Sequence, residues 1–213
     1  MKKISVKLAI AAILMLFAGS QLSAQSINLE ETMKLRAAQK AALFGEYLKD
    51  IARKHDDAGK SVPLQERLYY CTKALNLFIG KGSSYYENGV ERAGVMMETT
   101  SVNRATKSRR LIKNYLNGLA NLRYSEVKIE TTDVANIKVS DLQQIGEDTF
   151  VCTCSIYQTF VGYRDGRPIY KDITKKNIKC YIIHEEIVKD GGEREHEFIV
   201  LLGDVTASET RRG

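Results

Sequence analysis

Two long β-rich runs joined by a tight turn constrain this chain more than any other feature. They extend from Thr149 to Ile187 and are separated by Asp165-Gly166. Asp-Gly is typical of a β-hairpin because glycine adopts the positive φ that a two-residue turn needs. Alternate residues of the first run are apolar, and side chains of a strand alternate between its two faces. One face of the hairpin is therefore predicted to be buried, with the residues Phe150, Cys152, Cys154, Ile156 and Phe160.

The first 24 residues have the pattern of a secretory signal peptide. A basic start that ends at Lys7 is followed by ten apolar residues, Leu8 to Phe17, and then by small residues up to Ala24. Ten apolar residues are too few to span a membrane, which needs about 20. Ser20 stands where a bacterial lipoprotein would have its lipidated cysteine. We therefore expect an exported bacterial protein, periplasmic or secreted, with no membrane anchor after cleavage.

The charge of the remaining chain is nearly balanced. The full sequence has 32 basic and 26 acidic residues and a net charge of +6. Without Lys2, Lys3 and Lys7, 29 basic residues remain and the net charge falls to +3. This small excess gives no support to nucleic-acid binding. A chain of this length normally forms one domain, which we expect at residues 25–206, followed by a polar tail at 207–213.

Four cysteines, Cys71, Cys152, Cys154 and Cys180, leave two interpretations open. In the first, all four are small buried hydrophobic residues, because Cys152 and Cys154 share the apolar face and Cys71 lies on the apolar stripe of a predicted helix. In the second, Cys180 forms a disulfide with Cys71 or with Cys152, which export would permit. A zinc site is disfavoured because zinc ligands usually come in pairs from loops or turns. We expect no metal and no cofactor.

Helices are predicted in the first half of the chain. Apolar residues recur at i+3 or i+4 in residues 28–54 and again in residues 61–79, which indicates two amphipathic helices. A loop is expected at 81–94, a short strand at 95–102 and a third helix at 103–122. The basic residues in the first turns of this third helix are interpreted as a solvated face, with a patch for a phosphate or an acidic partner as the alternative.

Only strands are predicted after Tyr124. They are expected at 124–132, at 137–145, within the 149–187 hairpin and at 195–206. Short turns between them favour antiparallel pairing, since parallel neighbours need crossover connections. The fold class is therefore α+β, with N-terminal helices packed in the concave face of a long, curved antiparallel sheet. The second strand of the hairpin is long enough to require a bend, which we expect near residues 174–177.

The order helix, helix, strand, helix and then long antiparallel strands, over residues 28–206, resembles the nuclear transport factor 2-like superfamily. That resemblance implies a cone-shaped α+β fold, also called cystatin-like, with a cavity between helices and sheet. It concerns architecture, because no motif is matched residue by residue. The superfamily includes dehydratases, isomerases, ligand-binding proteins and accessory domains of exported bacterial proteins, so the fold does not decide the function.

No catalytic motif occurs in the sequence, so the candidate site consists of residues that could face the cavity. Gln158 interrupts the apolar alternation of its strand. A buried amide needs hydrogen-bond partners, so either a ligand or water supplies them or Gln158 points outward. The remaining candidates are aromatic or acidic residues on neighbouring segments. The full set for ligand binding is Tyr85, Tyr86, Glu98, Tyr115, Gln158 and Tyr170.

Three functional hypotheses follow from these patterns. The first is an exported, non-catalytic binding or accessory protein that holds a small ligand or a protein partner in or on the cone. The second is an acid-base lyase or isomerase with Tyr115, Glu98 or Gln158 near the reacting group. It requires an aspartate, glutamate or histidine inside the cavity, within hydrogen-bond reach of a second polar group. The third is a structural subunit that forms a homodimer through the outer face of the sheet. Its candidate contacts are Tyr157, Val161 and Tyr163.

Overall fold

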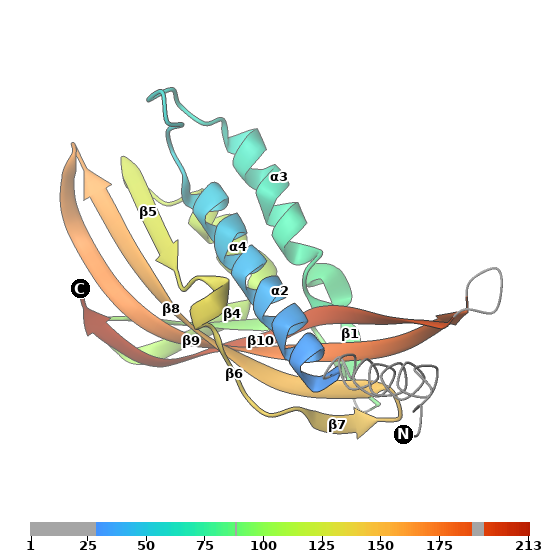
Figure 1. Cartoon of the computed structure of the whole chain (residues 1–213). Helices are drawn as coiled ribbons and strands as arrows, with labels where there is room; N and C mark the ends of the chain where they lie inside the picture. The colour runs from blue at the N-terminus through green and yellow to red at the C-terminus, as the bar shows by residue number, and fades with distance from the viewer. Residues whose placement is uncertain (1–28, 88, 189–193) are drawn as a thin grey trace, which may run out of the picture. The chain divides into compact units, whose positions relative to one another are not determined.

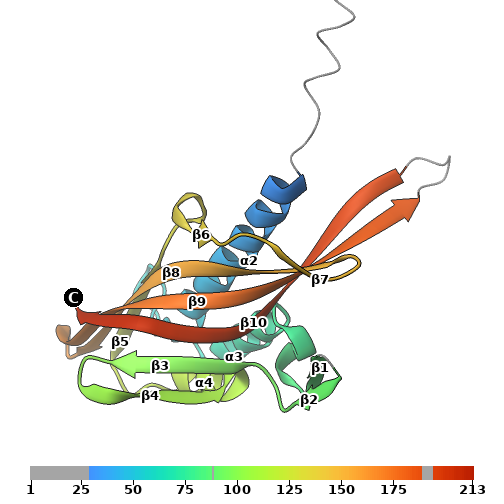
Figure 2. The same cartoon turned by 90° about the horizontal axis from the view of Figure 1, so that it is seen from below.

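Long β-strands dominate the computed structural model, which describes residues 29–87, 89–188 and 194–213. Residues 33–213 form one compact unit, in which three helices lie on one face of a strongly curved sheet (Figure 1). Seen from below, the strands lie in front and the helices behind them (Figure 2). The expected signal peptide lies outside the described residues. In the described part, no helix is both long enough and apolar enough to cross a membrane.

The described residues of the main sheet form eight strands, with the order β4-β3-β10-β9-β8-β5 and with β6 and β7 also paired to β8. A separate hairpin consists of β1 (Tyr85–Glu87) and β2 (Val90–Arg92). The strands of the main sheet are β3 (Met96–Ser101), β4 (Arg104–Leu111), β5 (Glu126–Thr131), β6 (Lys138–Val139), β7 (Gln143–Gly146), β8 (Thr149–Arg164), β9 (Arg167–Val188) and β10 (Arg194–Arg212).

The hairpin predicted around Asp165-Gly166 is confirmed. Arg164 on β8 pairs with Arg167 on β9, and the two residues between them have φ values of 52° and 74°. Positive φ at both positions matches the right-handed twist of the paired strands. The bend expected near residues 174–177 is not accompanied by a break in pairing, because the only register shift between the described residues of β8 and β9 falls at Gly162/Tyr163. The inward and outward faces of β9 therefore alternate without interruption from residue 170 to residue 183.

The sheet is mixed, which corrects the expectation of purely antiparallel pairing. Strand β10 lies between β9 and β3 and runs parallel to β3, with Val205 opposite Met97. Short turns specify only how consecutive strands pair, whereas β3 pairs with β10 from the other half of the chain. The expected polar tail is also corrected, because β10 continues to Arg212 and its residues 207–212 pair with the start of β9.

Residues 103–111 form a strand where the start of the third helix was expected. β4 folds back on β3 after a turn at Val102 and Asn103, and helix α4 (Ile112–Ala120) begins only after it. Two basic residues of β4, Lys107 and Arg109, meet acidic partners across the sheet. Arg109 lies 2.7 Å from the Asp204 carboxylate on β10, which also accepts the Met96 backbone N–H at 2.8 Å. These cross-strand pairs can form only when this segment is a β-strand.

Three other boundaries differ from the expectation. Helix α3 (Leu64–Leu75) ends four residues early because Phe78 pairs with β10 at Leu202. The expected loop at 81–94 contains the β1–β2 hairpin. The single strand expected at 137–145 is divided into β6 and β7.

The core lies between the helices and the inner face of the sheet. Helix α2 (Leu29–Ala52) buries its apolar stripe there, and Phe44 meets Phe78 edge to face with ring centroids 5.0 Å apart. Gly45 brings α2 against β5, since a Cβ on this residue would lie 2.4 Å from the Thr131 hydroxyl oxygen. On the opposite face of β8, Tyr157 is 46% exposed. Whether this face forms a dimer contact stays a prediction.

Candidate functional site

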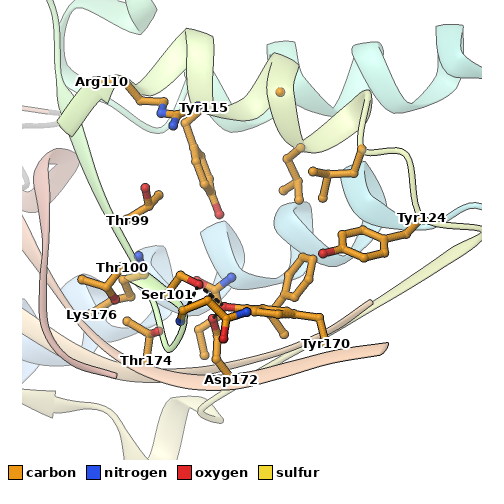
Figure 3. Close-up of a pocket in the computed structure, with 16 residues that line it drawn as sticks. Thr99, Thr100, Ser101, Arg110, Tyr115, Tyr124, Tyr170, Asp172, Thr174 and Lys176 are labelled. Carbon is orange, nitrogen blue, oxygen red and sulfur yellow. Dashed lines mark hydrogen bonds between the residues drawn. The ribbon is translucent and has the colours of Figure 1, made fainter. Parts of the chain in front are cut away.

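A cavity of about 470 Å³ lies between α4, the end of β3 and the inner face of β8 and β9 (Figure 3). It occupies one end of the same face that carries the core. The apolar inward residues of β9, such as Ile178, Cys180 and Ile182, are followed toward the start of the strand by polar ones. The cavity is therefore the place where the inner face of the sheet changes from hydrocarbon to polar groups.

The polar floor of the cavity comes from alternate residues of β9, namely Tyr170, Asp172, Thr174 and Lys176. Residues two apart on a strand point to the same face. Asp172 is 6% exposed and Lys176 is 4% exposed. Two ionisable side chains this deeply buried cost free energy unless they are hydrogen-bonded or paired, so such groups are typical of functional sites.

Asp172 is held by Tyr170. The Tyr170 hydroxyl donates to the Asp172 carboxylate, and its oxygen lies 2.9 Å from Oγ of Ser101 on β3 (Figure 3). Burial raises the pKa of Asp172, against the opposing effects of the Tyr170 hydrogen bond and the Lys176 charge. Burial and the contact with Asp172 raise the pKa of Tyr170 to about 12. At neutral pH this tyrosine therefore carries its proton.

Lys176 donates a hydrogen bond of 2.8 Å to the backbone oxygen of Glu98 on β3. Burial lowers the pKa of the Lys176 ammonium to about 8, although the charges of Asp172 and Glu98 act in the opposite direction. A lysine with a pKa near 8 has an appreciable neutral fraction close to neutral pH. It can act as a hydrogen-bond donor, a proton donor or a base within the cavity.

Gln158 and Tyr115 both line the cavity. Gln158 is buried on the inner face of β8 opposite Thr174, so the alternative in which it points outward is excluded. Its side-chain oxygen Oε1 has no hydrogen-bond partner among the described residues. The Tyr115 ring projects from α4 toward the sheet (Figure 3). Burial raises the pKa of Tyr115, and a hydrogen bond with Gln158 partly offsets that increase.

The other side of the cavity is apolar and aromatic. Leu119 and Leu122 contribute aliphatic groups, and Phe160 lies between Tyr124 and Tyr170 with ring centroids 5.8 Å from each. Gly162 lets the Tyr124 ring approach the sheet, since a Cβ there would lie 2.6 Å from the ring. The cavity thus combines a polar floor with an apolar wall, which is the usual make-up of a small-molecule site.

Three of the six candidates from the sequence line the cavity: Tyr115, Gln158 and Tyr170. The other three do not. Tyr85 and Tyr86 are on the separate β1–β2 hairpin, and Tyr86 is 71% exposed. Glu98 has the opposite parity to Met97 on β3, and its carboxylate accepts the Ala207 backbone N–H and approaches Lys107. Ligand binding by any of the six stays a prediction.

Four polar residues of the cavity lining were not predicted from the sequence: Asp172, Thr174, Lys176 and Arg110. The first three were assigned to no face, and a bend was expected near residues 174–177. Extending the parity of Ile178 backward along an unbroken strand would have placed Lys176 and Asp172 on the inner face. Arg110 was assigned to a solvated helix, whereas it belongs to β4 and lies beside Tyr115 (Figure 3).

The cysteines are away from the cavity lining. All four are free and buried, so neither disulfide considered from the sequence is present. Among the described residues, one group of metal-ligating side chains gathers closely: Cys152, Cys154 and Cys180.

The sequence matches no protein-family model and no curated protein. Among solved structures, the chain is similar to a provisionally named scytalone dehydratase from Novosphingobium aromaticivorans. The similarity has a TM-score of 0.40 and 12% sequence identity, and it covers 87% of this chain and 89% of that chain. At this level the similarity identifies no function.

Proposed function

We propose that this protein is an exported member of the nuclear transport factor 2-like superfamily that binds a small organic molecule in the cavity. The observation that carries the proposal is the buried Oε1 atom of Gln158, which has no partner among the described residues although it borders a cavity of about 470 Å³. A buried acceptor without a donor costs about 1–3 kcal/mol. A ligand that donates a hydrogen bond at this position would recover that free energy.

The lining specifies the chemistry of the ligand. A hydroxyl or amide group would donate to Gln158, and a carbonyl or anionic oxygen would accept from Lys176. A ring or a branched hydrocarbon would pack on Phe160, Leu119 and Leu122. The volume falls within the range of about 300–1,000 Å³ that is typical of sites for small organic molecules. The ligand class is therefore a compact molecule with a polar end and an apolar end.

A cavity-filling variant tests this proposal. Gly118 borders the cavity from α4, and a Cβ added there meets no atom within 4 Å. Gly118→Phe would place a ring in the space that the ligand needs, whereas Asn117→Phe changes an exposed neighbour on the same helix and serves as the control. The probe is 8-anilinonaphthalene-1-sulfonate, whose rings, N–H and sulfonate match the lining. Its binding is measured by fluorescence titration.

We expect saturable binding of one probe molecule to the wild type and to Asn117→Phe, and at least tenfold weaker binding to Gly118→Phe. Gln158→Leu removes the unpartnered acceptor and should weaken binding of the probe by about tenfold, the loss of one hydrogen bond. Equal affinities of the two phenylalanine variants, or no saturable binding to the wild type, would rule out the cavity as a binding site.

A second candidate function is acid-base catalysis by a lyase or isomerase. The observation that favours it is Asp172, a buried carboxyl group in the cavity that accepts the Tyr170 hydroxyl. Acid-base catalysis needs such a carboxyl group within hydrogen-bond reach of a second polar group. In this function Asp172 would abstract a proton, and Lys176 or Tyr115 would stabilise the oxygen on which negative charge develops.

Proton abstraction can be measured without knowing the substrate. Cyclohexanone is incubated with the protein in heavy water, and incorporation of deuterium beside the carbonyl is followed by NMR. We expect the wild type to accelerate exchange and Asp172→Asn to lose at least 99% of that acceleration. Asp141→Asn, which removes an exposed aspartate paired with Lys34, is the control. Exchange by Asp172→Asn at the wild-type rate would exclude catalysis by this carboxylate.

A further inference from the structure

A cluster of three thiols lies on the inner face of the sheet. Cys152 and Cys154 are two residues apart on β8, and Cys152 is directly opposite Cys180 on β9. All three are at most 2% exposed. Their sulfur atoms lie within 4.8 Å of one another, and the sulfurs of Cys154 and Cys180 are 3.6 Å apart. Neighbouring strands thus bring three soft ligand atoms to one point in the core.

The spacing of the sulfurs suits a metal ion with three ligands. At a metal–sulfur distance of about 2.3 Å, three sulfurs at the corners of a triangle around the ion lie about 4 Å apart. The Cys154–Cys180 separation of 3.6 Å is slightly below this value, and the other two separations are no longer than 4.8 Å. Small side-chain movements would therefore complete the triangle without moving the backbone of two paired strands.

The ligand set selects the kind of ion. Thiolates favour soft ions such as Cu(I) and zinc over magnesium or calcium. Structural zinc is almost always bound by four ligands. Among the described residues, no histidine, carboxylate or fourth cysteine joins the group. Three sulfurs in an apolar core therefore fit an ion that accepts a low coordination number.

We propose that Cys152, Cys154 and Cys180 form a binding site for a single Cu(I) ion. The ion is held between β8 and β9 and excluded from water. Each thiol that binds as a thiolate releases one proton. The ammonium of Lys34 on α2 interacts electrostatically with Cys152. This site is separate from the cavity and does not depend on the proposed function.

Copper binding by the full chain tests the proposal. Because the thiols are buried, the protein is unfolded in guanidinium and refolded without oxygen in the presence of tetrakis(acetonitrile)copper(I). Loosely bound copper is then removed with bathocuproine disulfonate. The copper retained per chain is measured by mass spectrometry, together with the ultraviolet charge-transfer band of copper–thiolate bonds.

Cys71 supplies a matched control, because it is also a buried cysteine but lies on α3 outside the cluster. We expect one copper ion per chain in the wild type and in Cys71→Ala, and at least tenfold less in Cys180→Ala. Equal retention by the two variants, or loss of all copper from the wild type to the chelator, would overturn the proposal.

A further measurement covers the case in which Cys180→Ala does not fold. X-ray absorption of the copper-loaded wild type should show three sulfur neighbours at about 2.3 Å and no oxygen or nitrogen neighbour. Nitrogen or oxygen neighbours would contradict the site. A wild-type protein from the periplasm with two of these three thiols joined in a disulfide would contradict it as well.

Discussion

Replacement of Lys176 by methionine should stabilise the protein at neutral pH. The ammonium is buried, and burial lowers its pKa from 10.5 to about 8. The difference corresponds to about 3 kcal/mol, at about 1.4 kcal/mol for each pKa unit, by which the folded state disfavours the charged form. Methionine has a similar length and no charge. It also loses the hydrogen bond to the Glu98 backbone oxygen, which is worth about 1 kcal/mol. The expected net gain in the free energy of unfolding is about 2 kcal/mol at pH 7.

The pH dependence follows from the sign of the pKa change. Between pH 8 and 10.5 the unfolded state holds more protons on Lys176 than the folded state, so the stability of the wild type rises with pH in this window. The advantage of Lys176→Met should therefore fall by about 2 kcal/mol between pH 8 and 9.5. More than about one pH unit below 8, Lys176 is mostly protonated in both states, and the advantage should be nearly constant.

Guanidinium unfolding at pH 7 and at pH 9.5 measures this difference. Lys175→Met is the matched control, because it removes the same charge from the opposite face of β9. We expect the control to keep the pH dependence of the wild type. If Lys176→Met is less stable than the wild type at pH 7, or if its difference from the wild type is the same at both pH values, the argument that burial lowers the pKa of Lys176 is wrong.

Three further predictions test other parts of the structure by unfolding experiments. Gly45→Ala should destabilise the protein by about 1 kcal/mol, because the new methyl group would overlap with Thr131. Gly118→Ala should stabilise it by a similar amount through helix propensity. Equal effects of the two changes would contradict the close approach of α2 to β5. Hydrogen bonds from Lys179 and Tyr181 lower the pKa of Glu87 to about 2, so Glu87→Gln should destabilise the protein at pH 6. The difference in the free energy of unfolding between variant and wild type should shrink as the pH falls from 4.5 toward 2. A difference independent of pH would refute this. Removal of residues 207–213 should lower the free energy of unfolding by about 3 kcal/mol or more, because strand pairing is lost, including the 3.0 Å contact between the Thr210 and Thr174 hydroxyls. An unchanged melting temperature would mean that the end of β10 does not stabilise the protein.

Local rules in the sequence predicted the hairpin and the first two helices. Asp165-Gly166 specifies its turn without help from distant residues, and α2 has a continuous apolar stripe. β4 was missed because its own residues show no apolar alternation. Its extended form depends on partners elsewhere in the chain, including Asp204, which is 95 residues from Arg109. A pattern within one segment cannot contain that information.

Only part of the candidate site was predicted from the sequence, and the rest was missed for a related reason. Gln158 was identified because an amide is unexpected within an apolar alternation. Asp172 and Lys176 were missed because charged residues usually indicate solvent, and in a strand with several lysines they do not stand out. Their inward position follows only from the register with β8, in which Asp172 lies opposite Phe160 and Lys176 lies opposite Ile156.

The central position of β10 has a consequence for how the chain folds. This strand separates β3 from β9, and the Met96 amide that it binds through Asp204 is 108 residues away in the sequence. Until β10 has been synthesised, β3 and β9 both have unpaired edges. Contacts between such distant segments form slowly, and unpaired edges invite aggregation. A chaperone that shields these edges should therefore raise the yield of native protein more than one that acts on the helices.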